Sequence, residues 1–151
     1  MTDDTEVLLR LCEEQWCQGR QSESQRATVT NFIITISAAI LGFLVQKEFT
    51  LTSLPLAILL IALGVYGAVI SAKLYERWQF HMRRARYWRK RIDELHPDAR
   101  IDQLKVESDL EHKRKYPKLE KIRLNRLWSA LHILIILIGV ACTIIIIIRR
   151  L

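Results

Sequence analysis

A short stretch in the middle of the chain combines many cations with aromatic rings. Residues 77–91 hold seven arginines or lysines and four aromatic side chains. Guanidinium groups pair bidentately with phosphate oxygens, and aromatic rings stack on nucleobases. The stretch therefore favours a phosphate-rich anionic ligand such as a nucleotide or oligonucleotide. The candidate ligand-binding residues are six bases and three rings: Arg83, Arg84, Arg86, Arg89, Lys90, Arg91, Trp78, Tyr87 and Trp88.

Membrane topology and lipid contact offer a second interpretation of these bases. Residues 73–126 hold seventeen bases and nine acids, whereas residues 1–26 hold three bases and six acids. Bases accumulate in the cytoplasmic loops of membrane proteins, and near the surface each contributes about 1 kcal/mol of attraction to anionic lipids. Both interpretations, a specific anionic ligand and a lipid-facing loop, stay open at this point.

Three long runs without a charged residue determine the class of the protein. They cover residues 27–46, 49–72 and 127–148. A hydrocarbon core about 30 Å thick is crossed by about 20 apolar helical residues. We therefore predict three transmembrane helices. The remainder is too small and too charged to bury a large soluble core, which excludes a soluble enzyme of ordinary size.

Polar residues recur at helical spacing within two of the predicted spans. Such groups in a membrane usually face protein or water, so they indicate a helix-packing face or a pore face. Small residues at four-residue spacing in the second span, Gly64, Ala68 and Ala72, indicate close helix packing. The candidate pore or packing residues are Thr28, Asn31 and Thr35 in the first span, and Ser129, His132 and Thr143 in the third.

The predicted fold is all-α, with four segments. Residues 1–26 are expected to form an N-terminal amphipathic helix, and residues 27–72 a transmembrane hairpin. Residues 73–126 form a basic helical domain, and residues 127–151 the third transmembrane helix. The basic loop predicts that residues 73–126 and the N-terminus are cytoplasmic in a multi-pass membrane protein.

Within the basic domain, the second transmembrane helix is expected to continue to about Leu95. A heptad pattern runs through this stretch and fits either self-association or packing on a neighbouring helix of the same chain. Its positions are Leu74, Trp78, His81, Ala85, Trp88, Ile92 and Leu95. A break at His96-Pro97 follows, and we expect Asp98 to cap a helix over residues 99–115. The last helix is expected to begin near Lys118 and run without interruption into the third span.

Motifs for catalysis or metal binding are not recognisable. The chain has no phosphate-binding glycine loop, no nucleophile elbow and no zinc spacing around Cys12 and Cys17. We therefore expect a protein that is not an enzyme and uses no cofactor or metal. No Asp or Glu lies inside a predicted span, which argues against a proton-coupled transporter.

Three segments together resemble small bacterial membrane effectors of anti-phage systems. They are EEQWCQGRQSESQRATVTNFIITISAAILGFLVQ, ERWQFHMRRARYWRKRIDELHP and the return span that opens with LWSALH. The organisation is similar to the Hailong-system channel effector and to the RipA-like family of oligomeric membrane proteins. The resemblance implies an oligomeric inner-membrane ion channel that depolarises the cell. It also implies control by a nucleotide or DNA oligomer made by a partner nucleotidyltransferase.

We therefore expect a homo-oligomer, because three spans with polar and small faces are too few to enclose a wide path alone. The expected partners are further copies of the chain, membrane lipids and the anionic ligand. A non-conducting oligomeric scaffold shares every packing feature and differs in predicting no ion flux. A small transporter subunit is the third alternative.

Overall fold

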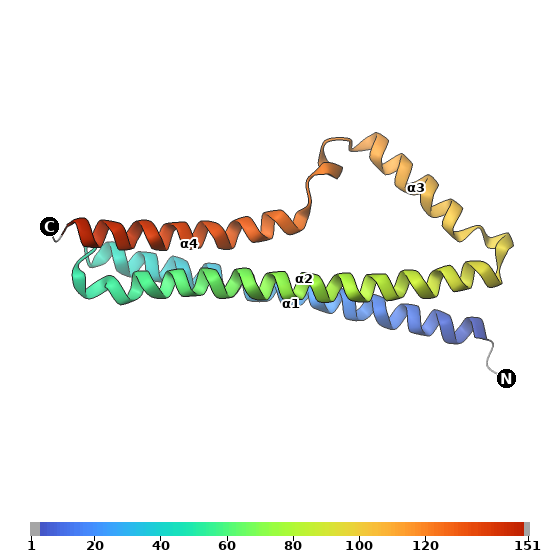
Figure 1. Cartoon of the computed structure of the whole chain (residues 1–151), viewed down its shortest axis with the longest axis horizontal. Helices are drawn as coiled ribbons and strands as arrows, with labels where there is room; N and C mark the ends of the chain where they lie inside the picture. Colours follow the sequence, from blue (N-terminus) through green and yellow to red (C-terminus); the bar gives the residue numbers. More distant parts are fainter. Residues whose placement is uncertain (1–3, 150–151) are drawn as a thin grey trace. The chain divides into compact units, whose positions relative to one another are not determined.

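The computed structural model describes residues 4–149, and within this range it is helical and contains no strand. Turns and short 3-10 helices join the α-helices (Figure 1). The α-helices are α1 (Asp4–Gln46), α2 (Leu54–Leu95), α3 (Ile101–Lys115) and α4 (Leu124–Ile148). The 3-10 helices are η1 (Leu51–Ser53), η2 (Pro97–Ala99) and η3 (Leu119–Lys121). The prediction of an all-helical protein is confirmed for the described residues.

The described chain forms two compact units. The charged unit comprises residues 4–23 and 76–123, and the apolar unit comprises residues 24–75 and 124–149. Helices α1 and α2 each contribute residues to both units. The expected N-terminal helix and the first span are thus parts of one helix, because α1 is unbroken from Asp4 to Gln46.

Three helices, α1, α2 and α4, contain stretches long and apolar enough to cross a membrane. Only 28% of each such stretch is buried within the chain. Phe32, Val69 and Leu137, for example, are each more than half exposed. A helix that presents apolar side chains outward in this way requires lipid or another protein surface to cover them.

The turn between α1 and α2 is closed by backbone hydrogen bonds and by a distant arginine. Glu48 and Phe49 adopt left-handed backbone angles, with φ of 51° and 56°. The amide of Phe49 donates to the carbonyl of Leu44 at 3.1 Å. At the end of α4, Arg149 donates to the carbonyl of Glu48 at 2.7 Å, and its guanidinium lies over the Phe49 ring. The turn and the end of α4 are therefore held together.

Glycines bring α2 and α4 into contact at the level of their backbones. A Cβ on Gly64 would lie 3.0 Å from the amide nitrogen of Ile136. A Cβ on Gly139 would lie 3.0 Å from the amide nitrogen of Ile61. The predicted close packing through small residues therefore occurs between α2 and α4, at Gly64. Ala72, by contrast, is exposed.

The connection from α2 to α3 corrects one expectation. Helix α2 ends at Leu95 and α3 at Lys115, close to the predicted positions. Asp98 does not cap α3, because it lies in η2, and α3 has no side-chain cap at its N-cap residue Arg100. Asp93 provides this contact instead, since its Oδ1 accepts the amide proton of Ile101 at 2.7 Å. The carboxylate of Asp93, on α2, therefore stabilises the N-terminal end of α3.

The last helix also begins later than expected. Residues 119–121 form η3, Ile122 is extended, and α4 starts only at Leu124. The prediction of a helix running unbroken from Lys118 is therefore wrong. Leu119 and Ile122 are more than half exposed, so no burial of apolar side chains holds this segment in a helix.

We expect Gly139→Ala to destabilise the apolar unit. The new Cβ would meet the backbone of α2, and overpacking of this kind costs about 1–3 kcal/mol. Gly42→Ala is the matched control, because no atom lies within 4 Å of a Cβ there and alanine favours a helix. Thermal unfolding in detergent should show a lower midpoint for Gly139→Ala alone. Equal midpoints for the two variants would contradict the backbone contact.

Candidate functional site

One face of the apolar unit is polar and turned outward. Thr28, Asn31 and Thr35 on α1, the outward polar face, are all exposed. The hydroxyl of Thr28 donates to the Ser24 carbonyl at 3.0 Å, and that of Thr35 donates to the Asn31 carbonyl at 2.9 Å. Threonine hydroxyls satisfied by their own helix are tolerated in apolar surroundings.

The Asn31 side chain has no such local partner. No hydrogen bond of its amide occurs among residues 4–149. An amide carries two donors and an acceptor, and leaving them unpaired in hydrocarbon costs free energy. Asn31 is therefore the residue of this face that most needs a contact from outside the chain.

The polar residues of the third span lie differently. His132 is fully buried, and its Nε2 shares a hydrogen bond of 3.3 Å with the hydroxyl of Thr30 on α1. A Cβ on Gly67 of α2 would collide with the His132 ring. The hydroxyls of Ser129 and Thr143 donate to carbonyls of their own helix, at 3.1 and 2.9 Å. The two faces that looked alike in the sequence thus differ, since His132 packs inside the chain and Asn31 faces out.

Arg26 joins the three helices of the apolar unit. Its side chain is buried, with 1% exposed. The Nε donates to Ser71 Oγ on α2 at 2.8 Å, and an Nη donates to Asn125 Oδ1 on α4 at 2.6 Å. The guanidinium carbon lies 5.4 Å from the centre of the Tyr75 ring and 5.3 Å from that of Trp128. Hydrogen bonds and cation–π contacts together make up for the water that this cation has lost.

Sequence reasoning missed Arg26, although a signal was present. Arg26, Thr30, Ile33 and Ser37 follow one another at intervals of four, three and four residues, and all four are buried. That spacing places them on one helix face. A charge in register with the buried positions of a span indicates a charged residue that is enclosed by protein.

In the charged unit, the heptad positions of α2 face α1. His81 Nδ1–H donates to Gln15 Oε1 at 2.9 Å, and both side chains are buried. The thiol of Cys12 donates to the Ala85 carbonyl at 3.6 Å. Ala85 and Ile92 are also buried, whereas Leu95 is exposed. The heptad pattern is thus used for packing within the chain, one of its two predicted uses.

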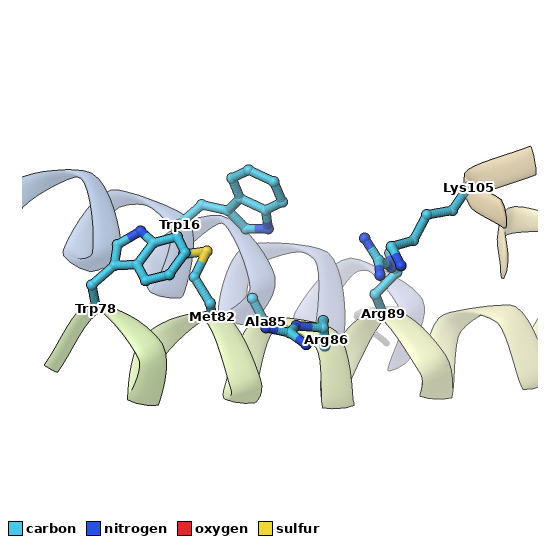
Figure 2. A pocket seen from close by; sticks show the side chains of 7 residues that line it. All are labelled: Trp16, Trp78, Met82, Ala85, Arg86, Arg89 and Lys105. Atoms are coloured by element: carbon cyan, nitrogen blue, oxygen red, sulfur yellow. The ribbon is translucent and has the colours of Figure 1, made fainter. Parts of the chain in front are cut away.

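A cleft in the charged unit combines rings with cations. Its volume is about 210 Å³, and we name it the tryptophan–arginine cleft. The lining residues come from α1, α2 and α3 (Figure 2): Trp16, Trp78, Met82, Ala85, Arg86, Arg89 and Lys105. Three of the nine residues expected to bind an anion are among them, Trp78, Arg86 and Arg89. Trp16 and Lys105 were missed, because they are far from residues 77–91 in the sequence.

The other six predicted ligand residues do not line this cleft. Arg84 lies over the Phe80 ring at 5.3 Å, and Arg91 pairs with Glu94 at 2.9 Å. Tyr87 is 71% exposed, with its ring edge against the ring of Trp88. Arg83 and Lys90 are exposed elsewhere on α2. A helix distributes fifteen consecutive residues over all its faces, so one cleft takes only some of them.

The charges of the cleft are only weakly compensated within the described chain. Arg86 forms no ion pair there, and Arg89 Nε lies 4.0 Å from Asp102 Oδ1. The Arg89 Nε is buried and lacks a hydrogen-bond partner among residues 4–149. Lys105 pairs with Asp109 of its own helix at 3.3 Å, and both side chains are well exposed to solvent. The arrangement is suited to attracting an anion.

The function is assigned without the help of a metal-binding cluster or of a similar protein. Among the described residues, no cluster of His, Cys, Asp and Glu side chains is arranged to hold a metal ion. Comparisons with family models, curated proteins and solved structures found no match. Function is therefore argued from the outward polar face and from the tryptophan–arginine cleft.

We expect the charged unit to lose stability on acidification through His81. Burial and the neighbouring Arg77 and Arg84 lower the pKa of His81, and Glu14 opposes them only partly. The unfolded chain therefore binds the proton at a higher pH than the folded chain, and stability falls as the pH drops below about 6.5. Midpoints of thermal unfolding in detergent, measured between pH 7.5 and 5.5, test this.

The control for this measurement is His81→Gln, which cannot titrate. Wild-type protein should lose more of its midpoint over this pH range than the variant does. Parallel decreases in the two proteins would show that His81 does not cause the loss.

Proposed function

We propose that the chain is a homo-oligomeric, channel-type effector of the bacterial inner membrane. A nucleotide or oligonucleotide bound to its basic cytoplasmic part controls the channel, and opening depolarises the membrane. The observation that carries the proposal is Asn31, an amide that faces outward from a helix apolar enough to span a membrane. The resemblance to anti-phage effectors leads to the same proposal.

The proposed topology places the charged unit in the cytoplasm. Residues 73–126 carry a net charge of +8, from seventeen bases and nine acids, and bases are retained on that side. Residues 1–26 then lie in the cytoplasm too, and residues 4–26 among them form the proposed amphipathic stretch of α1. Exposed bases outside the cleft, such as Arg83 and Lys90, are positioned for anionic lipid headgroups.

The path for ions is proposed to lie between copies of the chain. Within one copy, the backbones of α2 and α4 meet at Gly64 and Gly139, which leaves no room for a path between these helices. Polar groups inside a membrane face protein or water. Several copies with Thr28, Asn31 and Thr35 turned toward a common axis would give these side chains water.

The proposed ligand binds where aromatic and cationic side chains meet. Arg86, Arg89 and Lys105 supply positive charge, and Trp16 and Trp78 supply flat rings. Phosphate oxygens and a nucleobase are matched by these two kinds of group. A partner nucleotidyltransferase is the source that the resemblance implies for such a ligand.

Membrane potential in bacteria that express the chain tests the channel. We expect depolarisation, with the chain alone or with a nucleotide-producing enzyme co-expressed. Asn31→Leu should reduce the effect because it removes the amide from the proposed pore. Asn31→Gln, which keeps an amide, should retain it.

The substitution Ile36→Leu, at an exposed position of α1 that does not line the hollow between Thr28, Asn31 and Thr35, is the control for general damage to α1, and it should leave depolarisation intact. A normal potential in both conditions, with the protein present in the membrane, would contradict conduction. That result would favour the non-conducting oligomeric scaffold.

A further inference from the structure

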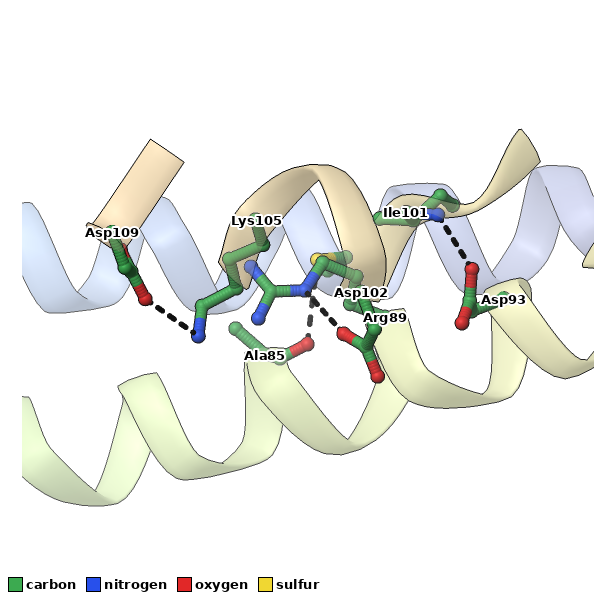
Figure 3. Close-up of polar contacts among 8 residues, drawn as sticks. Ala85, Arg89, Asp93, Ile101, Asp102, Lys105 and Asp109 are labelled. Atoms are coloured by element: carbon green, nitrogen blue, oxygen red, sulfur yellow. Dashed lines mark hydrogen bonds and ion pairs between the residues drawn. The ribbon is translucent and has the colours of Figure 1, made fainter. Parts of the chain in front are cut away.

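Helix α3 is held to the rest of the charged unit by few contacts. None of its residues is buried, and Leu104 and Leu110 are more than half exposed. Its first turn is attached to α2 by the Ile101 amide, which donates to Asp93, and by the 4.0 Å pair of Arg89 with Asp102 (Figure 3). A helix with so little packing depends on additional contacts for a fixed position.

The tryptophan–arginine cleft offers such contacts, because α3 forms one of its walls through Lys105. Figure 2 shows Trp78 and Met82 toward one end of the cleft and Arg89 and Lys105 toward the other. The cleft thus has an apolar, aromatic end and a cationic end. An anion at the cationic end would contact α2 and α3 at once.

The size of the cleft restricts the ligand. An apolar cavity of about 150 Å³ holds a benzene-sized ring. A cleft of about 210 Å³ that is partly open to solvent therefore encloses about one ring with an anionic group at its edge, leaves the rest of a monophosphate outside, and is too small for several nucleotides. The buried Arg89 Nε, which lacks a partner in the described chain, provides an unused donor at the cationic end.

We propose that the tryptophan–arginine cleft binds one phosphate ester of an aromatic ring system, of the size of a nucleoside monophosphate. The ligand clamps α3 onto α2. The ring lies against Trp78 and Met82, with Trp16 beside it, and the phosphate joins Arg89 and Arg86 to Lys105. The inference rests on the proposed function for the class of ligand, and it adds the site, the size and the ordering of α3.

Ion pairs already present would be exchanged when the ligand binds. Lys105 leaves Asp109, an exposed partner one turn away on the same helix, and such pairs contribute little stability. Arg89 exchanges a 4.0 Å contact with Asp102 for a charge-assisted hydrogen bond to phosphate. The exchange replaces weak contacts by stronger ones, and the new ones connect two helices.

Titration of the full-length chain in zwitterionic lipid nanodiscs tests the site. Adenosine and guanosine monophosphate, adenosine, and inorganic phosphate are added while tryptophan fluorescence is recorded. Monophosphates should bind at least tenfold more tightly than either adenosine or inorganic phosphate. Equal affinity for monophosphate and inorganic phosphate would overturn the role of the rings and with it the proposal.

Matched charge variants separate the cleft from the rest of the basic surface. Arg86→Gln, Arg89→Gln and Lys105→Gln should each weaken monophosphate binding at least tenfold. Arg83→Gln and Lys90→Gln, which remove the same charge outside the cleft, should change it less than threefold. Similar losses in both groups would assign binding to diffuse charge and overturn the site.

Hydrogen exchange tests the clamp itself. Amides of residues 101–115 should exchange several-fold more slowly with monophosphate bound, and this protection should disappear in Lys105→Gln at saturating ligand. Unchanged exchange in wild-type protein would overturn the clamp. These measurements do not involve ion flux, so their failure is distinguishable from failure of the channel, which the potential of the Asn31 variants reports.

Discussion

The buried guanidinium of Arg26 is the constraint on which the apolar unit depends. A cation removed from water must be surrounded by acceptors and rings, or its burial destabilises the fold by several kcal/mol. Ser71 of α2, Asn125 of α4 and the rings of Tyr75 and Trp128 supply these groups. The guanidinium of arginine is planar and rigid, with its donors in fixed directions. Its partners therefore fix how α1, α2 and α4 are rotated about their axes and where they lie along one another.

This arrangement of the helices determines which of the other polar side chains are buried and which are exposed. His132 is enclosed and shares a hydrogen bond with Thr30, on the same face of α1 as Arg26. Asn31 follows Thr30 in the sequence, so its side chain points about 100° away from that of Thr30 around the helix axis and faces outward. The proposed pore face and the buried face of the apolar unit are thus two faces of one helix. The rotation of α1 that buries Arg26 and Thr30 also turns Asn31 outward.

Sequence patterns predicted those features that depend on single helices. Runs without charges gave the three candidate spans, and the break at His96-Pro97 gave the end of α2. Sequence patterns did not predict contacts between segments that are distant in the sequence. Asp93 holds the start of α3 from eight residues away, and Lys105 and Trp16 complete a cleft whose other walls come from α2. Periodicity reports which face of a helix is apolar, but not which residues of another helix meet it.

The central claim, that Asn31 lies in a water-filled path between copies, is tested most directly by thiol accessibility. The measurement is the current across a planar bilayer, with and without adenosine monophosphate, through purified protein whose native cysteines are replaced by alanine. A charged thiol reagent should alter the current through Asn31→Cys and leave that through Val69→Cys, exposed on α2, unchanged. Absence of current, or an equal response of the two variants, would contradict the account.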